Sequence, residues 1–444
     1  MRDATDADFN KGSRLLSVKV ELYFDGADNA PFTAQKGDYL IDAAWLEEGS
    51  ADSSSLFGTI SSNDISFRLL NKNGMFSPTN AAGPYYGKIK QGVKIIPYIK
   101  PEYAADEVAW VQLGVYYITG WNCEITGTYA DVVANDIWYN IFKQPVPSYP
   151  VALNKTYKAF LTSILTLLGF TATISDELDT NVPYCFLDGS VQQSLQDITA
   201  AGLAYVTSDK AGVPVVGALF GAKETRATLT DGDQIVSVSA KQSITRSYDG
   251  VSLAYSIPQI SAIQSLLEMS NLTVPIGSLT VEKASFSKGP MWQVSTVHIF
   301  ALSDDVSLTS YNATPWQMSF TLNNAGVQVT ASVSVFGTVV ELTEITISDN
   351  VTKILTVSNK YIQDATYAQK YKNALTAFVT NNTPVIVLTI KGNPLLAVGD
   401  KIVVQSVKYN LDFIGIIQRL NYDYVGSLSC EMTLLNASVL QGVT

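Results

Sequence analysis

The chain has little charge and almost no histidine. Charged residues make up 16% of its 444 positions, and His298 is its single histidine. A catalytic base is most often histidine, and it needs a nucleophile and an orienting partner. The sequence contains no GxSxG elbow, no HExxH motif and no phosphate-binding glycine loop. We therefore predict no catalytic residue, no metal ligand and no cofactor, and we expect His298, in the alternating segment QVSTVHIFAL, to be an ordinary strand residue.

Cysteines and long apolar runs are also scarce. Cys123, Cys185 and Cys430 lie far apart and without metal-ligand spacing, which predicts buried or half-buried thiols in a reducing compartment. The absence of a run of about 18 apolar residues argues against a membrane span. The amino terminus, MRDATDADFNKGSR, lacks the apolar centre of a secretory signal.

Acidic residues outnumber basic ones, and the net charge is −11. This balance argues against a surface that grips nucleic acid by neutralising phosphates, but it is compatible with a surface along which nucleic acid passes. Glycoside cleavage would need two carboxylates about 5 to 9 Å apart. Asp304 and Asp305 in LSDDVS and Asp423 in NYDYVG are typical of turns, and Asp249 and Glu431 have no evident partner. The chain is therefore not predicted to be an enzyme.

Hydrophobic residues are abundant, at 47%, and 23 Tyr and 17 Phe favour extended structure. The length predicts roughly three or four domains of ~100 to 200 residues each. Alternating strands joined by a turn around Asp28 and Asn29 are expected within 14–47. Further strands are expected at 65–70 and 93–100, and a hairpin at 111–136. These form a first β domain, 14–150.

The next segment, 151–225, changes to helical periodicity. A helix capped by Gly169 is predicted from the apolar spacing of Tyr157, Phe160, Leu161, Ile164, Leu165 and Leu168. A second helix at 191–202 and the strands LAYVT and VPVVGAL follow. This pattern indicates a small α+β domain.

The remainder is again mainly β. We predict a second, discontinuous β domain from 226–258 and 351–444, with a helix at 360–379, and a β-sandwich inserted at 259–350. In the sandwich, Tyr311, Trp316 and Met318 could bind a sugar or a partner. Packing of Trp316 and Phe320 in the core is the favoured alternative.

A short motif occurs twice. IKQGVKIIPYI at 89–99 matches NPLLAVGDKIVVQSV at 393–407, so that Gly92, Lys94, Ile95 and Ile96 fall on Gly399, Lys401, Ile402 and Val403. A predicted hairpin follows each copy, and Gly114 and Val115 are matched to Gly415 and Ile416. The sequence thus predicts one β module present near both ends of the chain.

The pattern LLNKNGMFSPTNAAGPYYGKIKQGVKIIPYI, followed by VAWVQLGVYYITGW and ADVVANDIW, resembles the first domain of bacteriophage tail-tip and baseplate hub proteins. The segment 393–437 is similar to their closing barrel. Together the two ends cover about half of the chain, and residues 260–350 match no family. The resemblance implies a mainly β fold with two barrels related to the tail tube.

The resemblance further implies a homotrimer. Its six barrels would contact a six-fold tail tube, and the trimer would bind a three-fold spike or fibre. The implied partners are the tail tube or distal tail protein, the tape measure protein, central spike or tail fibre proteins, and DNA that passes without specific binding. The implied location is the virion tail tip or baseplate, after synthesis in the bacterial cytoplasm. We expect acidic residues to line the channel and the hairpins 121–129 and 421–428 to take equivalent places around the ring.

Two alternatives stay open. The chain could be a carbohydrate-binding adhesin of the same particle, with the sandwich as its binding face. It could instead be a hub with peptidoglycan hydrolase activity, although the sequence ends just after the last barrel strand and leaves no room for an appended enzyme.

Overall fold

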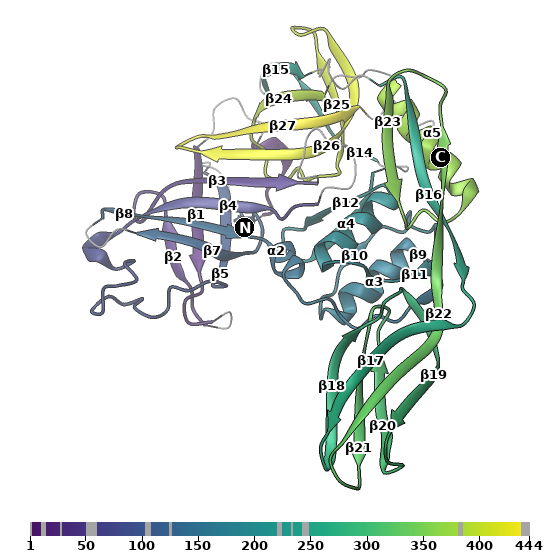
Figure 1. Cartoon of the computed structure of the whole chain (residues 1–444). Coiled ribbons are helices and arrows are strands. Elements are labelled where there is room, and N and C mark those ends of the chain that lie inside the picture. Colours follow the sequence, from purple (N-terminus) through teal and green to yellow (C-terminus); the bar gives the residue numbers. More distant parts are fainter. Residues whose placement is uncertain are drawn as a thin grey trace.

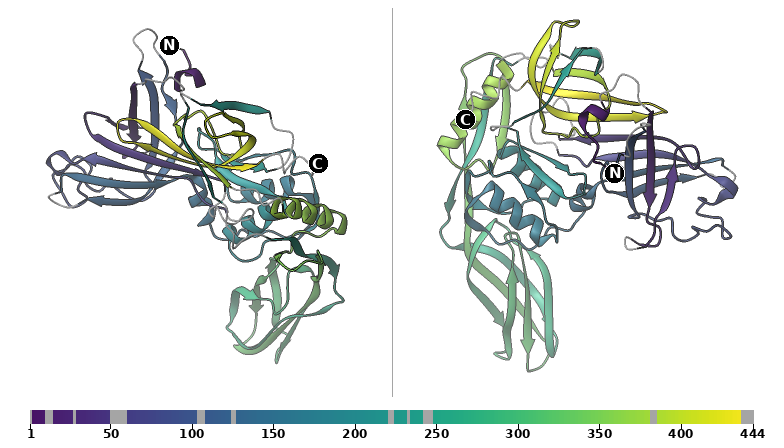
Figure 2. Two further views of the ribbon diagram at one scale, coloured as in Figure 1. Left: turned by 90° about the horizontal axis from the view of Figure 1, so that it is seen from above. Right: turned by 180° about the vertical axis from the view of Figure 1, so that it is seen from behind.

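The computed structural model describes residues 2–9, 15–26, 29–49, 60–102, 108–123, 127–219, 224–231, 234–241, 248–380 and 385–436. The fold is mainly β, as predicted. Figure 1 shows two β modules beside each other, a central group of helices, and an elongated pair of sheets that projects away from both modules. Two further views show the same arrangement (Figure 2).

The first module contains eight strands in the order β2-β1-β5-β7-β8-β4-β3, with β6 paired to β5. Their bounds are β1 Leu15–Leu22, β2 Phe32–Gln35, β3 Leu40–Glu48, β4 Asp64–Leu70, β5 Lys94–Glu102, β6 Val111–Gln112, β7 Tyr116–Cys123 and β8 Tyr129–Asn135. The turn around Asp28 and Asn29 was expected to join the first two long strands. Instead the short strand β2 lies between them and pairs with β1, whereas β3 pairs with β4. The turn at Asp28 lies outside the described residues.

The second module has the strand order β15-β24-β27-β26-β25-β14. Its strands are β14 Thr225–Thr230, β15 Ile235–Lys241, β24 Val385–Lys391, β25 Lys401–Ser406, β26 Leu411–Tyr424 and β27 Leu428–Asn436. Strand β26 also pairs with β3, so the two modules form one 14-stranded sheet over one continuous apolar core. Helix α1, Asp6–Phe9, adds Phe9 to this core, and Asp6 forms an ion pair with Arg226 of β14.

The helical region follows the sequence pattern closely. Helix α3, Tyr157–Leu167, begins after Thr156, whose hydroxyl accepts the Ala159 N–H, and helix α4, Val191–Ala201, begins after Ser190 in the same way. Gly169 has φ +83°, which suits the predicted C-terminal cap. The other elements are α2 Ile137–Phe142, β9 Ala152–Thr156, β10 Thr173–Ile174, β11 Asn181–Cys185, β12 Ala204–Ser208 and β13 Pro214–Ala218. Both predicted helices and the β12–β13 hairpin are confirmed.

Three elements assigned to the second barrel lie elsewhere. Strand β16, Gly250–Ile260, pairs with β23, Ile354–Asn359, and with β22, and not with any strand of the 14-stranded sheet. Helix α5, Ala365–Thr380, packs its buried stripe in the same core as α3 and α4. The Tyr371 hydroxyl donates to the Ala200 carbonyl at the end of α4. The helix was predicted as part of the second β domain, whereas it packs on the helical region.

Helix α5 also begins later than the predicted residue 360. The Asp364 side chain accepts the Tyr367 N–H at 2.7 Å, which sets the helix start. Tyr361 precedes it in a buried turn, and its hydroxyl donates to the Phe186 carbonyl. Burial of Tyr361 thus holds the residues before Asp364 outside the helix.

The projecting region consists of two small sheets that share an apolar core. Its strands are β17 Gln264–Val274, β18 Gly277–Ser285, β19 Met291–Ala301, β20 Val306–Ala313, β21 Gln317–Asn324 and β22 Val329–Ser348. β17 and β19 flank β22 in one sheet, and β18, β21 and β20 form the other. Strand β22 continues beyond the sandwich to pair with β16, so one strand connects the insert to the centre of the molecule (Figure 1).

Candidate assembly interface

The repeated motif has the same backbone geometry in both modules. Gly92 and Gly399 have φ values of +86° and +88°, a region that favours glycine. The Gly92 N–H donates to the Ile118 carbonyl at 2.8 Å, and the Gly399 N–H donates to the Ile417 carbonyl at 2.8 Å. Both isoleucines donate in return, each at 2.9 Å, to the residue after the glycine. The prediction of a duplicated turn and strand is therefore supported by matching hydrogen bonds.

The strand register corrects the detailed match. Ile95 pairs with Tyr116 in the first module, and Ile402 pairs with Gly415 in the second. Tyr116 therefore corresponds to Gly415, and the expected match of Gly114 is wrong by two residues. Gly114 precedes β7 and has φ +156°, whereas Gly415 lies within a paired strand. The two glycines are identical but not equivalent, because residue identity alone carries no information on strand register.

Two β-bulges extend the correspondence. The β7–β8 ladder skips Thr119, and the β26–β27 ladder skips Gln418 at the equivalent place. Likewise the β3–β4 ladder skips Ile41, and the β15–β24 ladder skips Val236. A bulge changes the facing of every later residue, so shared bulges fix the alignment of the strands. Five strands of the first module thus correspond to five of the second: β3 to β15, β4 to β24, β5 to β25, β7 to β26, and β8 to β27.

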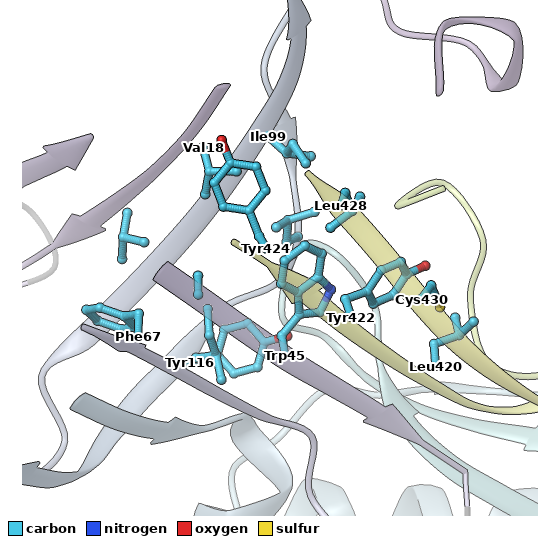
Figure 3. Close-up of a cluster of buried hydrophobic side chains, with 14 of the residues drawn as sticks. Val18, Trp45, Phe67, Ile99, Tyr116, Leu420, Tyr422, Tyr424, Leu428 and Cys430 are labelled. Atoms are coloured by element: carbon cyan, nitrogen blue, oxygen red, sulfur yellow. The ribbon is translucent and has the colours of Figure 1, made fainter. Parts of the chain in front are cut away.

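The two modules meet where β26 pairs antiparallel with β3, from Arg419 opposite Glu48 to Tyr424 opposite Ala43. We call this ladder the seam. At its centre the rings of Trp45 and Tyr422 stack with centroids 4.7 Å apart, and both side chains are buried (Figure 3). The Tyr424 hydroxyl donates to the Leu16 carbonyl of β1 at 2.9 Å. Backbone pairing, aromatic packing and a buried hydrogen bond therefore all hold the modules together.

Buried charges connect the seam to the helical region. Glu47 is buried in β3 and forms an ion pair with Lys210, from the turn after β12. Burial raises the pKa of Glu47, and Lys210 partly opposes that rise. On the opposite face of the strand pair, Arg419 Nε lies 2.9 Å from Glu48 Oε1. A lysine of the α+β domain therefore neutralises a carboxylate inside the module junction.

Asp136 forms a second buried polar contact at this junction. One carboxylate oxygen accepts the Trp138 N–H at 3.0 Å and caps α2, and the other accepts the Ser208 hydroxyl of β12 at 2.7 Å. Burial raises the pKa of Asp136 to about 7, although these hydrogen bonds oppose the rise. Asp136 and Glu47 are not among the site residues that the sequence predicts. Asp136 follows the end of a strand and Glu47 lies within an apolar strand, and neither sequence position indicates a charged junction between modules.

The strands near the seam are acidic, and among their carboxylates Glu47 is buried whereas Asp423 and Glu431 are exposed. Strands β3, β4, β8, β26 and β27 contain two basic residues, Arg68 and Arg419, and no lysine. Their acidic residues are Asp42, Glu47, Glu48, Asp64, Asp131, Asp412, Asp423 and Glu431. Arg68 Nε lies 2.7 Å from Asp131 Oδ1, and Arg419 is paired with Glu48. Both arginines of these strands are thus neutralised by carboxylates.

The carboxylates considered for catalysis are dispersed. Asp423 and Glu431 are exposed on the β26–β27 hairpin, Asp304 and Asp305 lie in the turn between β19 and β20, and Asp249 precedes β16. His298 is exposed on β19, beside the rings of Phe300 and Phe336. Within the described part of the chain, no group of three potential metal ligands is present, and no described helix is long and apolar enough to cross a membrane.

Trp316 has a role that neither sequence interpretation foresaw. Its ring NH donates to the Leu187 carbonyl of the α+β region, and its ring lies 6.4 Å from that of Phe186. Met318 and Phe320 fill the sandwich core, whereas Tyr311 is 50% exposed. Trp316 therefore attaches the sandwich to the centre of the molecule. The thiols follow expectation, with Cys185 and Cys430 buried and Cys123 half-buried.

The fold of this chain is similar to that of tail proteins of known structure. The 43 kDa tail protein of prophage MuSo2 from Shewanella oneidensis has 10% sequence identity and a TM-score of 0.53 over 96% of this chain and 99% of that one. A tail protein from Neisseria meningitidis MC58 has 9% identity and a TM-score of 0.54 over the same shares. No family model and no curated protein sequence matches the chain. The resemblance to phage tail proteins is thus confirmed at the level of the fold.

Proposed function

We propose that the protein is a structural hub of a phage tail tip or baseplate, in which three chains form a ring of six similar modules. The observation that carries this proposal is the correspondence of five strands and two bulges between modules joined edge to edge. Such a chain converts three-fold symmetry into approximate six-fold symmetry, so it can connect a six-fold tail tube or distal tail protein to a three-fold spike or fibre. The tape measure protein and the passing DNA would occupy the central channel.

The direct test is the number of copies in an assembled tail. Cryo-electron microscopy of tail tips, or native mass spectrometry of the isolated tip complex, should give three copies around the axis. One or two copies per tail would contradict the proposal. A monomer in dilute solution would not, because ring subunits can require a template and a high local concentration to assemble.

The acidic face near the seam supports a channel that DNA crosses without binding. We propose that this face, including Asp42, Asp131 and Asp423, lines the channel, since like charge keeps the phosphate backbone from adhering. Purified trimer should not retain duplex DNA at low salt. Asp42→Lys combined with Asp423→Lys should produce salt-sensitive retention, whereas the same changes at the sandwich residues Asp304 and Asp305 should not. Retention by the unmodified trimer would contradict an acid-lined channel.

The two equivalent hairpins, 121–129 and 421–428, are proposed contacts to a neighbouring ring. Val425 and Gly426 form the tip of the second, and Val425 is 70% exposed. Shortening either hairpin should leave a folded trimer but prevent joining of the tube. Normal tails from a folded double deletion would show that both are only turns between paired strands.

The adhesin alternative finds limited support in the sandwich. Trp316 is committed to an internal contact, which leaves Tyr311 as the exposed aromatic of the segment highlighted in the sequence. The hydrolase alternative would need two carboxylates facing each other across a substrate, and the five candidates lie on separate elements or on one exposed hairpin. Binding of the isolated trimer to host cell walls, or release of peptidoglycan fragments by it, would favour these alternatives over the hub.

A further inference from the structure

Three turns meet at the outer end of the projecting sandwich (Figure 1). They join β17 to β18, β19 to β20 and β21 to β22, at positions 275–276, 302–305 and 325–328. The register brings them together, because β17 and β19 both pair with the start of β22, and β18 and β20 both pair with the last residue of β21. We call these three turns the sandwich tip. Trp316, which attaches the sandwich to the centre of the molecule, precedes the eight residues of β21, so the tip lies roughly 23 Å beyond that attachment.

A buried asparagine joins the turns of the tip. Asn324 is almost fully buried, and its side-chain amide donates to the Val274 carbonyl at 3.2 Å and to the Val327 carbonyl at 2.8 Å. The Ala325 N–H donates to the Asp305 carbonyl at 3.2 Å, which connects the third turn to the second. The tip is therefore one hydrogen-bonded unit, and it loses little conformational freedom when it binds.

Each turn of the tip carries an exposed aliphatic side chain. Leu302, Val327 and Ile276 are 94%, 71% and 70% exposed. Turn positions are usually occupied by Gly, Pro, Asn, Asp and Ser, each of which suits turn geometry. Single apolar residues on a surface are common, but a group of them marks a contact site. Three neighbouring turns with one large aliphatic residue each therefore indicate a surface that is covered in the assembled particle.

The charge of the tip restricts what can cover it. The three turns contain Asp304 and Asp305, both exposed, and no lysine or arginine. Anionic lipid surfaces attract basic segments, and membrane interfaces favour Trp and Tyr, none of which occurs in these turns. A second tip would bring like charges together. A different protein with an apolar pocket and a basic border matches both the aliphatic residues and the carboxylates.

We infer that the sandwich tip docks into an apolar socket, bordered by lysine or arginine, on a second protein of the tail. Leu302, Val327 and Ile276 enter the socket, and Asp304 pairs with its border. Burial of the aliphatic side chains supplies the affinity, and the carboxylate fixes the orientation. This inference rests on the proposed role in a tail, and it adds an interface distant from the two β modules.

Photo-cross-linking in assembled tails tests the contact. When p-benzoylphenylalanine replaces Leu302, its excited ketone takes a hydrogen atom from a neighbouring C–H group, and the two radicals join as a C–C bond. Mass spectrometry of digested tails then identifies the linked peptide. We expect one apolar peptide of a different tail protein, with at least one lysine or arginine. Its yield should be at least tenfold above that from a probe at Leu167, an exposed leucine of α3.

Substitutions separate the apolar and the charged parts of the contact, with the photo-probe placed at position 327. Leu302→Ser combined with Ile276→Ser should lower the adduct yield at least tenfold, and Leu167→Ser should leave it unchanged. Asp304→Lys should lower the yield at least threefold, whereas Asp304→Glu, which keeps the charge, should not. An unchanged yield with Asp304→Lys would overturn the basic border. Thermal unfolding of each variant checks the fold, which these exposed side chains should not alter.

Other occupants of the tip give different results. Adducts only to further copies of this chain, or a yield from position 302 no higher than from position 167, would overturn the inference. The purified protein should not float with vesicles of phosphatidylglycerol and phosphatidylethanolamine. Flotation that Leu302→Ser abolishes would assign the tip to lipid and overturn the protein socket.

The outcomes also separate the inference from the proposed function. Three copies per tail with no adduct from the tip would overturn the docking and leave the hub function standing. An adduct from the tip in tails that hold one or two copies would overturn the ring and leave the docking standing.

Discussion

The two modules share five strands and two bulges, yet they differ at their outer strand and in their junctions. In the first module β1 runs antiparallel to β5, whereas in the second β14 runs parallel to β25. The first module meets its neighbour through buried aromatic and charged residues. The equivalent positions of the central aromatic pair are smaller, with Ala240 in place of Trp45 and Cys123 in place of Tyr422. The repeated strands thus preserve the shared geometry, while their side chains distinguish the junction from its equivalent positions.

The largest expected effect is at the centre of the seam. Trp45→Ala should lower the free energy of unfolding by about 3–5 kcal/mol, because it removes a buried ring stacked on Tyr422. Trp45→Phe should cost roughly 1 kcal/mol, since the Trp45 ring NH has no hydrogen-bond partner among the described atoms. Urea denaturation followed by tryptophan fluorescence and circular dichroism measures both.

A matched pair of changes is Tyr422→Ala in the seam and Cys123→Ala at the equivalent position in β7. In the monomer Cys123→Ala should cost about 1 kcal/mol or less. An equal loss for the two variants would remove the distinction between the buried seam and the equivalent position in β7.

A smaller loss of unfolding free energy is expected when the buried carboxylate of Glu47 loses its partner, Lys210. Lys210→Met should destabilise the fold by about 2–3 kcal/mol, below the value for fully buried pairs because the Lys210 side chain is 30% exposed. Adding Glu47→Gln, which removes the buried carboxylate charge, should restore most of the loss. A double variant no more stable than Lys210→Met would show that the lysine acts through packing and not through charge.

Asp136 offers a comparison that depends on pH. Its equivalent in the second module is Asn436. Ala134 pairs with Ile65 in the first module, and Leu434 pairs with the equivalent Ile386 in the second, so each of Asp136 and Asn436 lies two residues further along. The folded-state pKa of about 7 lies above the ordinary value of 3.8, so the folded protein holds a proton that the unfolded chain releases. This group's contribution to stability is therefore present below about pH 4 and is lost as pH rises toward 7.

Asp136→Asn should remove that slope. The unfolding free energy of the variant, relative to that of the parent, should increase by roughly 1–3 kcal/mol from pH 4 to pH 7. Denaturation midpoints at four pH values provide the measurement, with Asp304→Asn as an exposed control. Parallel stability profiles for parent and variant would contradict a protonated Asp136.

The smallest expected difference compares the two glycine turns. Gly92→Ala should cost about 1–2 kcal/mol from its positive φ alone, because nothing lies within 4 Å of the added Cβ. At Gly399 the added Cβ would clash with the Tyr205 hydroxyl, so Gly399→Ala should cost about 1 kcal/mol more as the ring moves away. Thermal unfolding of both variants gives the comparison. Equal losses of stability for the two variants would mean that the turn of the second module accommodates the added methyl group as easily as the turn of the first.

The features that could be predicted were those encoded within a few residues. The apolar spacing from Tyr157 to Leu165 defined α3, Ser190 and the residues after it defined α4, and the glycine turns identified the duplication. An acid-lined channel stays a prediction from the net charge. The residues of the junction could not be found, since Glu47 and Asp136 become special through neighbours more than 70 residues away.

The sequence by itself determined that the chain is mainly β, where its two main helices lie, and that a turn, strand and hairpin recur near both ends. Only the tertiary structure decided that β26 pairs with β3, that β16 and β23 join the helical region, and that Trp316 anchors the sandwich. The reason is that local patterns specify which residues can form a strand and which of its faces is apolar. Every strand presents the same backbone groups, so these groups do not select a partner. Packing and register across distant segments select it.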